Sequence, residues 1–204
     1  YLRDSKKPMV FVPVYTGYEK VFEEKSYLGE LRGKAKKKES LLDVLGTLRS
    51  FKKSFGKVNV TFGEPIHLSP YLEERHPGWS NQDYEACNYR PDWAPELVDE
   101  LATTVVTEIN RAASVNPINL IALAILASPR QAMDENQLMR HMEAYRDLLA
   151  MVPYSDMTVL PDGHASDWLA HAEELGSVSR SKHDMGDLIQ TNERQAVTLT
   201  YYRN

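Results

Sequence analysis

Two short apolar runs, each broken by a glycine and followed by a glutamate, constrain the fold of this chain most strongly. The first run leads through Gly17 to Glu19, and the second, 45 residues later, leads through Gly63 to Glu64. Glycine permits a sharp turn, so we expect each run to be a strand that ends in a bend. Ligands of α/β sheets gather outside the carboxyl ends of strands. The pattern therefore predicts that the two glutamates line two walls of one site.

Elements alternate over residues 1–72, which predicts part of an α/β domain. Strands are expected at about 9–15 and 57–62, with a polar, lysine-rich loop at about 20–39 and a helix at 40–55 between them. The helix is predicted from apolar side chains at helical spacing, namely Leu41, Leu45, Leu48, Phe51 and Phe55. Strand, helix, strand is the βαβ unit, so we expect a parallel pair of strands.

The rest of the chain predicts a different organisation. Residues 73–96 are rich in turn formers and form a connection, and residues 97–204 form a mainly helical region that ends in a β-hairpin. Periodicity and capping residues place the helices at 96–113, from Asn116 onward, at 134–151 with Asp134 as cap, and at 166–175 with Ser166 as cap. The hairpin strands are expected at 187–190 and 196–201.

Composition excludes several kinds of site. The chain has a single cysteine, Cys87, so it has no internal disulfide and no cysteine-cluster metal site. Its six histidines show no metal-binding spacing, so we assign neither a metal nor a cofactor. The longest apolar run, 120–127, is far shorter than the roughly 20 residues that span a bilayer. The chain contains no Gly-x-Ser-x-Gly motif, so an acyl-serine intermediate is not supported.

Charge is unevenly distributed along the chain. Residues 1–57 carry 14 basic and 7 acidic side chains, a net of +7, whereas the whole chain has a net charge of −5. This asymmetry indicates an anionic partner, and no nucleic-acid-binding signature accompanies it. The phosphates of a small substrate or an anionic lipid surface fit better. The basic side chains concerned are Arg32, Lys34, Lys36, Lys37 and Lys38. The alternative is that this basic run is a solvent-exposed loop without a binding function.

Taken together, these motifs resemble the glycerol-3-phosphate acyltransferases of bacterial membranes. Residues 13–19 are similar to the third of four short blocks in that family, and residues 60–65 are similar to the fourth. The basic stretch 30–41, the run 153–155 and the tail 195–204 also resemble the family. Phe-Gly-Glu-Pro alone would be a weak signal, but all of these segments in register make a specific one.

The first block of the family, His-x-x-x-x-Asp, is missing from this chain. None of the six histidines has an aspartate five residues later, and the second, glycine-rich block is also absent. The chain begins Tyr1-Leu2 without a methionine or a signal peptide. We therefore expect the 204 residues to be a piece of a larger enzyme, with the catalytic His-Asp pair upstream and no catalytic residue in this chain.

The resemblance implies an activity and a set of partners. It implies transfer of an acyl chain from acyl-CoA or acyl-acyl-carrier protein to glycerol 3-phosphate, giving lysophosphatidate, at the cytoplasmic face of the bacterial inner membrane. This chain would then supply substrate-holding walls. The implied substrate-binding residues are Tyr15, Gly17, Tyr18, Glu19, Arg32, Lys34, Lys36, Lys37, Lys38, Gly63, Glu64 and Pro65.

Two other functions remain open from the residues alone. A non-catalytic module could dock on anionic membrane through the basic loop or bind a partner through the helical region. A phosphosugar enzyme on a similar sheet would need a phosphate-binding glycine loop, which the chain lacks. Glu19 could simply pair with a lysine, and Gly63-Glu64-Pro65 could simply end a strand.

Overall fold

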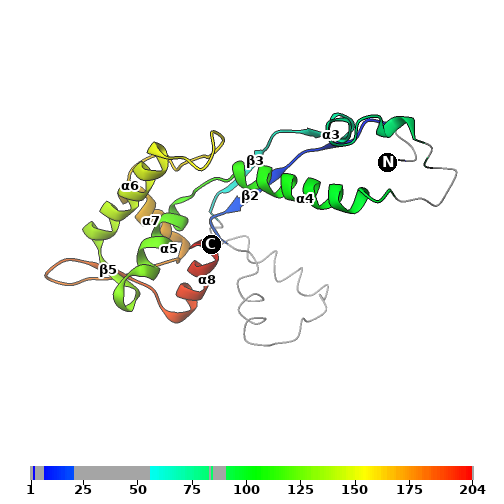
Figure 1. The fold of residues 1–204 in the computed structure, drawn as a ribbon. Coiled ribbons are helices and arrows are strands. Elements are labelled where there is room, and N and C mark those ends of the chain that lie inside the picture. Colours follow the sequence, from blue (N-terminus) through cyan, green and yellow to red (C-terminus); the bar gives the residue numbers. More distant parts are fainter. Residues whose placement is uncertain (1, 3–6, 21–55, 83, 85–90, 204) are drawn as a thin grey trace, which may run out of the picture. The chain divides into compact units, whose positions relative to one another are not determined.

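The computed structural model describes residues 2, 7–20, 56–82, 84 and 91–203 (Figure 1). The chain divides into two compact units. Unit 1 comprises Tyr1–Thr16, Val60–Ser114 and Ser155–Thr158. Unit 2 comprises Gly17–Asn59, Val115–Tyr154 and Val159–Asn204. The helix expected at 40–55 and residues 21–39 of the expected loop lie outside the described residues. The domain limits expected at residues 72 and 96 stay a prediction.

Four short strands lie in the described part of the N-terminal third. They are β1 (Val10–Phe11), β2 (Val14–Tyr18), β3 (Val58–Phe62) and β4 (Ile66–His67). β1 pairs with β4, and β2 pairs with β3. The strand expected at 57–62 is confirmed as β3. The strand expected at 9–15 is two strands, because Pro13 lies between them and has no N–H to donate to a ladder.

The strands are antiparallel, so the expected parallel pairing is wrong. β1 and β4 pair antiparallel. Along β2 and β3, Gly63 N donates to Pro13 O at 2.8 Å and Glu19 N donates to Lys57 O at 3.2 Å. The residue numbers therefore increase along β2 while those of their partners decrease along β3, which is the antiparallel arrangement. The expectation took the long connection for a crossover, but a connection of that length can also return the chain in the opposite direction.

The segment after β3 is a β-bulge. Phe11 pairs with Ile66, and Pro13 accepts from Gly63. Val12 alone therefore faces two residues, Glu64 and Pro65, which is the pattern of a bulge. Pro65 is compatible with it because a bulged residue is left out of the ladder. The exposed side chain of Glu64 is thus presented by an irregular point of the strand pair.

The expected bend at Gly17 is also wrong, because Gly17 is an interior residue of β2. This glycine is buried, and its φ is not positive. Glycine here gives no turn, and β2 continues through it to Tyr18. By contrast, a Cβ added to Gly63 would lie 3.1 Å from Glu108 O and 3.3 Å from Pro13 Cβ. Glycine at that position permits close approach of two backbone segments.

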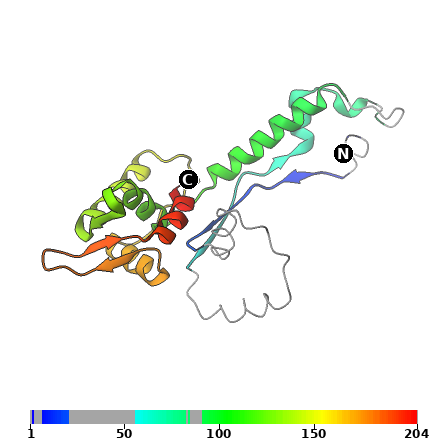
Figure 2. The ribbon, with the colours of Figure 1, turned by 90° about the horizontal axis from the view of Figure 1, so that it is seen from below.

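In its described part, unit 1 adds two α-helices and one short 3-10 helix to these strands. α3 (Leu68–Arg75) follows β4 directly, and the short helix η1 (Trp79–Asn81) precedes α4 (Ala94–Arg111). α4 confirms the helix expected at 96–113. In Figure 2, α4 runs beside β1 and β4. A small core of Leu68, Tyr71, Leu72, Trp79, Tyr84 and Leu97 joins these elements, with Phe11 and Ile66 packed against it.

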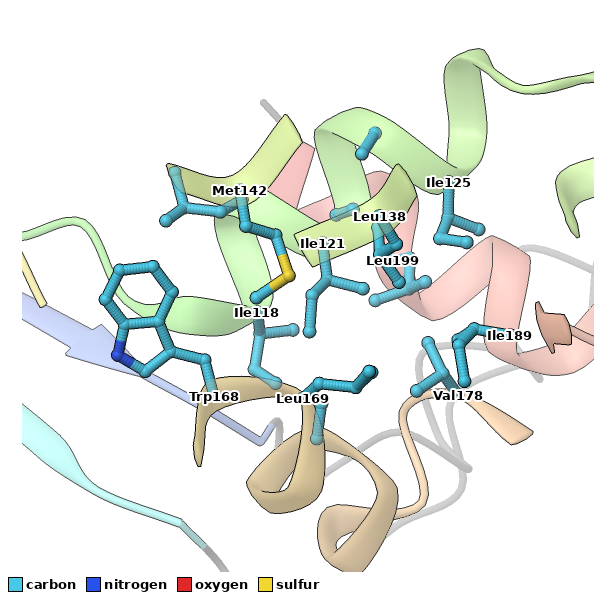
Figure 3. Close-up of a cluster of buried hydrophobic side chains, with 14 of the residues drawn as sticks. Ile118, Ile121, Ile125, Leu138, Met142, Trp168, Leu169, Val178, Ile189 and Leu199 are labelled. Carbon is cyan, nitrogen blue, oxygen red and sulfur yellow. The ribbon is translucent and has the colours of Figure 1, made fainter. Parts of the chain in front are cut away.

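Unit 2 is built around α5 (Pro117–Ala127), whose residues are apolar after Asn119. A helix that is hydrophobic on all sides has to be surrounded by other elements. α6 (Glu135–Met151), α7 (Ala165–Leu175) and α8 (Glu193–Arg203) surround it. Figure 3 shows Ile118, Ile121 and Ile125 of α5 among side chains from the other helices. Other buried side chains of this core are Leu138, Met142, Trp168, Leu169, Val178, Ile189 and Leu199.

Capping residues define the starts of the unit 2 helices. Asn116 caps α5, and its Oδ1 accepts from Ile118 N at 2.9 Å. Asp134 caps α6 by accepting from Gln137 N at 3.0 Å. Both caps confirm the expectation. α7 begins at Ala165, one residue before the expected cap Ser166, with His164 in the cap position, and it ends as expected at Gly176, whose φ is +74°.

Unit 2 also contains a three-stranded antiparallel sheet with the strand order β5-β7-β6. The strands are β5 (Ala132–Asp134), β6 (Ser179–Ser181) and β7 (Leu188–Gln190). β6 and β7 lie side by side as the orange strands of Figure 2. β7 confirms the first expected hairpin strand, although its partners are β5 and β6 instead of residues 196–201.

Residues 193–203 form α8, so the expected second hairpin strand is wrong. Asn192 and Gln195 form an N-terminal cap instead, in which Gln195 N donates to Asn192 Oδ1 and Asn192 N donates to Gln195 Oε1, both at 2.9 Å. Thr200 is accommodated in the helix because its Oγ1 donates to Ala196 O at 3.0 Å. Packing against α5 decides the conformation. No helix in the described part of the chain has the length and apolarity to cross a bilayer.

Candidate functional site at the end of β2

The carboxylate of Glu19 is the most deeply buried charge in the described chain, with only 2% of the residue exposed. Its Oε2 accepts a hydrogen bond from Lys57 N at 2.6 Å and lies 2.8 Å from His171 Nε2. Burial of a carboxylate is unfavourable unless hydrogen bonds compensate for lost hydration. The two bonds supply that compensation, and they join the end of β2 to the start of β3 and to α7.

The C-terminal half of α7 holds the next residue of the chain as well. Lys20 Nζ donates to Leu175 O at 2.6 Å, in the last turn of the helix. A cation at a helix C-terminus is favourable because the last carbonyl groups have no partner within the helix. α7 has no basic residue in its own last turn, so Lys20 fills this position. His171 and Leu175 thus fix two consecutive residues at the exit of β2.

Gly56 permits the approach of Glu19. Its φ is +72°, which is the left-handed region. A Cβ added to it would lie 2.7 Å from Glu19 Cβ and 2.8 Å from Glu19 Oε2. Any other residue would therefore meet both an unfavourable backbone conformation and a steric overlap with the buried acid. The contact of this glycine with Glu19 is a finding of the structure.

Tyr18 directly precedes these anchored residues and is 37% exposed. Its carbonyl oxygen accepts a hydrogen bond from Asn116 Nδ2 at 3.2 Å. The same asparagine caps α5 through its other side-chain atom, Oδ1. Asn116 is nearly fully buried, so one side chain fixes both the start of α5 and the backbone of β2. The phenol of Tyr18 is thereby presented from a backbone held on both sides.

A small cavity of about 30 Å³ borders Glu19 and Lys20. This space holds about two or three water molecules, so it is too small for a phosphorylated three-carbon substrate. Both described bonds to the carboxylate end on Oε2. The arrangement is suited to holding the exit of β2 in one position. It is less suited to Glu19 contacting a substrate within this cavity.

The expected site residues that the structure describes are divided between the two units. Gly17, Tyr18 and Glu19 lie in unit 2 and form one corner. Tyr15 and the segment 63–65 belong to unit 1, where Tyr15 Oη donates to Ser114 O over a long 3.5 Å. The shared site of Glu19 and Glu64 stays a prediction. The basic residues Arg32, Lys34, Lys36, Lys37 and Lys38 lie outside the described residues.

Three residues of this corner were not found by sequence reasoning: His171, Asn116 as a partner of β2, and Gly56 as a partner of Glu19. His171 and Glu19 are 152 positions apart, and no local pattern signals such a contact. Asn116 was recognised only as a helix start. Among the residues whose positions are described, no cluster of three or more histidine, cysteine, aspartate or glutamate side chains could hold a metal ion.

Comparison with known proteins gives the affiliation of the chain. The family model described as the glycerol-3-phosphate acyltransferase C-terminal region matches residues 27–204. The chain belongs to this glycerol-3-phosphate acyltransferase family. It is 46% identical over all 204 residues to the glycerol-3-phosphate acyltransferase of Pseudomonas paraeruginosa, and 47% identical to that of Pseudomonas putida strain GB-1. The enzyme of Pseudomonas fluorescens is 44% identical over the same length.

The resemblance seen in the two strand-glycine-glutamate motifs is therefore confirmed. The chain spans 24% of the length of these acyltransferases, while all of its own residues are matched. The family model begins at residue 27, after β2, whereas the matches to whole acyltransferases include β2 and Glu19. His171 and Asn116 thus lie within the segment that matches the C-terminal-region model, and Glu19 lies just before it.

Proposed function

We propose that this chain is part of a glycerol-3-phosphate 1-O-acyltransferase of phospholipid biosynthesis and that its β2 exit positions Tyr18 toward glycerol 3-phosphate. The observation that carries the proposal is the double anchoring of Glu19 by Lys57 N and His171 Nε2. A buried acid with two donors fixes the backbone beside it. Orientation of a reacting group can lower a barrier by several kcal/mol, so a fixed substrate wall is itself a catalytic contribution.

The reaction would proceed by direct acyl transfer. A histidine oriented by an aspartate, both expected outside these 204 residues, takes the proton from the 1-hydroxyl of glycerol 3-phosphate. The hydroxyl oxygen attacks the thioester carbonyl carbon of acyl-CoA or acyl-acyl-carrier protein. The new C–O bond forms, the C–S bond breaks, and the thiol leaves with a proton. The product is 1-acylglycerol 3-phosphate. By this proposal the 204 residues alone are inactive.

The remaining expected site residues take supporting roles in this proposal. Arg32, Lys34, Lys36, Lys37 and Lys38 would hold the phosphate or an anionic membrane surface at the cytoplasmic face of the inner membrane. Glu64 would orient a hydroxyl or a basic side chain, because a carboxylate repels phosphate. Support for Glu64 comes from its exposed place on the bulge, since bulges often redirect side chains near functional sites.

The proposal is tested in the full-length acyltransferase with steady-state kinetics. Glu19→Ala and Tyr18→Phe are each expected to lower kcat/KM for glycerol 3-phosphate by about tenfold or more, since a hydrogen bond to a charged group contributes about 1.5–3 kcal/mol. KM for the acyl donor should stay unchanged. His171→Ala should reproduce part of the Glu19→Ala defect, and His171→Gln should recover it because an amide N–H can still donate to Glu19.

Glu174→Ala is the matched control, because Glu174 is an exposed acid on the same helix as His171. It should leave both constants unchanged. Wild-type values of kcat/KM in folded Glu19→Ala and Tyr18→Phe proteins would contradict the proposal. Vesicle binding that survives Glu19→Ala and Glu64→Ala, but is lost when Lys36, Lys37 and Lys38 become Glu, would favour a docking module instead.

A further inference from the structure

The strand pair of unit 1 has one covered face and one apolar face that is exposed. On the covered face, Pro13 and Gly63 are buried, and Gly63 lies against the backbone of α4 at Glu108. The other face carries Val12 and Val14 of the first segment. Side chains alternate between faces along a strand, so residues two apart share a side. Only one side of the pair is therefore covered by the described part of unit 1.

The pairing register places the exposed residues of both strands together. Because Pro13 pairs with Gly63 in an antiparallel ladder, Val14 faces Phe62 and Thr16 faces Val60. Side chains of residues that face each other across a strand pair lie close enough to contact one another. Phe62 is 64% exposed and Val60 is 53% exposed. Val12, Val14, Val60 and Phe62, here called the open face, therefore form one continuous apolar surface.

Such a surface is unfavourable in water. Burial of a valine or phenylalanine side chain contributes about 1.5–3 kcal/mol, and a two-stranded ribbon is at best marginally stable unless other elements pack on it. Strands covered on both sides read as nearly continuous apolar runs. The run Val10-Phe11-Val12-Pro13-Val14 has this character, with apolar residues on both faces. The residues of the open face are therefore typical of a surface that is buried in an interface.

Charge decides which kind of partner fits it. The described residues of unit 1 carry three basic side chains, Lys7, Arg75 and Arg111, against nine acidic ones, a net of −6. An anionic lipid surface would be repelled by this charge, since membrane docking depends on basic residues near the surface. The four side chains of the open face are apolar, and the charged residue beside them, the exposed Glu64 that faces Val12, is also acidic. An apolar polypeptide surface is the occupant that satisfies both conditions.

The lengths of the relatives indicate where that polypeptide surface comes from. The chain spans only 24% of the acyltransferases that match it end to end. We propose that the open face is an internal interface, covered in the full-length acyltransferase by apolar side chains of the same polypeptide from outside these 204 residues. The proposal rests on family membership and not on the catalytic role assigned to the exit of β2.

Photo-crosslinking in the full-length protein tests this. Phe62 is replaced by p-benzoylphenylalanine, which is also aromatic, and crosslinked peptides are identified by mass spectrometry. Met185, 91% exposed in unit 2, is replaced in the same way as the control position. We expect position 62 to crosslink to a peptide outside the 204 residues, independently of protein concentration.

Cysteine labelling gives a second, independent readout. Val60→Cys and Met185→Cys variants are treated with a maleimide, and modification of the peptide that carries each new cysteine is quantified by mass spectrometry. Quantification by peptide keeps the natural Cys87 out of the measurement. We expect the thiol introduced at position 60 to react at least tenfold more slowly than the thiol introduced at position 185.

Each other outcome overturns the proposal and identifies the occupant. A crosslink that grows with protein concentration indicates a second copy, and a crosslink to phospholipid indicates a membrane. A crosslink to residues 21–55 indicates cover from within this chain. Equal labelling of positions 60 and 185 without a crosslink shows that the face stays in water. None of these readouts measures acyl transfer, so failure of the proposed function would leave this test unaffected.

Discussion

His171 Nε2 lies 2.8 Å from Oε2 of Glu19, and the two residues are 152 positions apart in the chain. This contact ties the exit of β2 to α7. Lys57 N donates to the same oxygen, so a single carboxylate joins three segments of unit 2. This contact and the residues around it lead to four predictions about the stability of unit 2. In each, Trp168 fluorescence follows the unfolding of unit 2, in a background where Trp79 and Trp93 are phenylalanine.

Removal of the buried acid should destabilise unit 2. Glu19→Ala leaves Lys57 N without its acceptor and is expected to lower the free energy of unfolding by about 1–3 kcal/mol. Glu19→Gln keeps the acceptor and should cost less. Glu64→Ala, at an exposed acid, should change stability by less than about 0.5 kcal/mol. Urea denaturation measures all three, and an equal effect of the two alanine variants would contradict the role given to Glu19.

Gly56→Ala should be more harmful than the same change at another left-handed glycine. Both Gly56 and Gly176 have positive φ, +72° and +74°. A Cβ at Gly56 overlaps Glu19, whereas a Cβ at Gly176 meets nothing within 4 Å. Each should lose about 1–2 kcal/mol from the backbone conformation. The excess loss in Gly56→Ala, read from thermal and urea unfolding, reports the overlap, and the absence of an excess would refute it.

Two substitutions should separate the two roles of Asn116, which are the cap of α5 and the hydrogen bond to Tyr18 O. Asn116→Ala removes the cap of α5 and the bond to Tyr18 O, so we expect a loss of about 2–3 kcal/mol in unfolding free energy. Asn116→Asp keeps an acceptor for Ile118 N and Asn119 N but cannot donate to Tyr18 O. It should retain most of the helix stability. Hydrogen exchange of the β2 peptide is expected to rise in both variants, and a rise only in Asn116→Ala would assign no role to the Tyr18 bond.

Arg180 should stabilise unit 2 in a pH-dependent way. Its guanidinium donates to Glu173 Oε1 at 2.9 Å and to Asp187 Oδ2 at 2.9 Å, and it pairs with Glu135 Oε2 at 2.7 Å. Hydrogen bonding from Arg180 lowers the pKa of Asp187, and the hydrogen bonds to Glu135 and to the other two carboxylates raise the pKa of Arg180. Arg180→Met leaves three neighbouring carboxylates without their cation, so it should destabilise unit 2 at neutral pH.

The sign of the pH effect follows from the lowered pKa of Asp187. A carboxylate whose pKa is lower when folded stabilises the fold above its unfolded pKa, about 3.9 for aspartate. That contribution is lost as the pH falls through the folded pKa. The difference between wild type and Arg180→Met should therefore shrink as the pH falls from about 7 toward about 3. Arg146→Met, at an exposed ion pair, is the control and should show a small, pH-independent effect.

Local signals in the sequence were sufficient for much of the helical part. The helices from 96, Asn116 and Asp134 were predicted because an apolar stripe and a capping residue both act within one or two turns. The resemblance to the acyltransferases was also carried by short contiguous motifs. The C-terminal helix was missed because Asn192 and the threonines after it favour a turn and a strand locally. Burial of Leu199 against α5 overrides that preference.

The family, the positions of four helices and the strand β3 could be predicted from the residues alone, because these features depend on neighbours along the chain. The antiparallel pairing of β2 and β3, the continuation of a strand through Gly17 and the contact of Glu19 with His171 became known only from the folded chain. Strand direction and long-range ion pairing depend on which surfaces meet after the chain has closed. Those meetings are set by the total burial and hydrogen bonding of the unit, and no segment of a few residues contains that information.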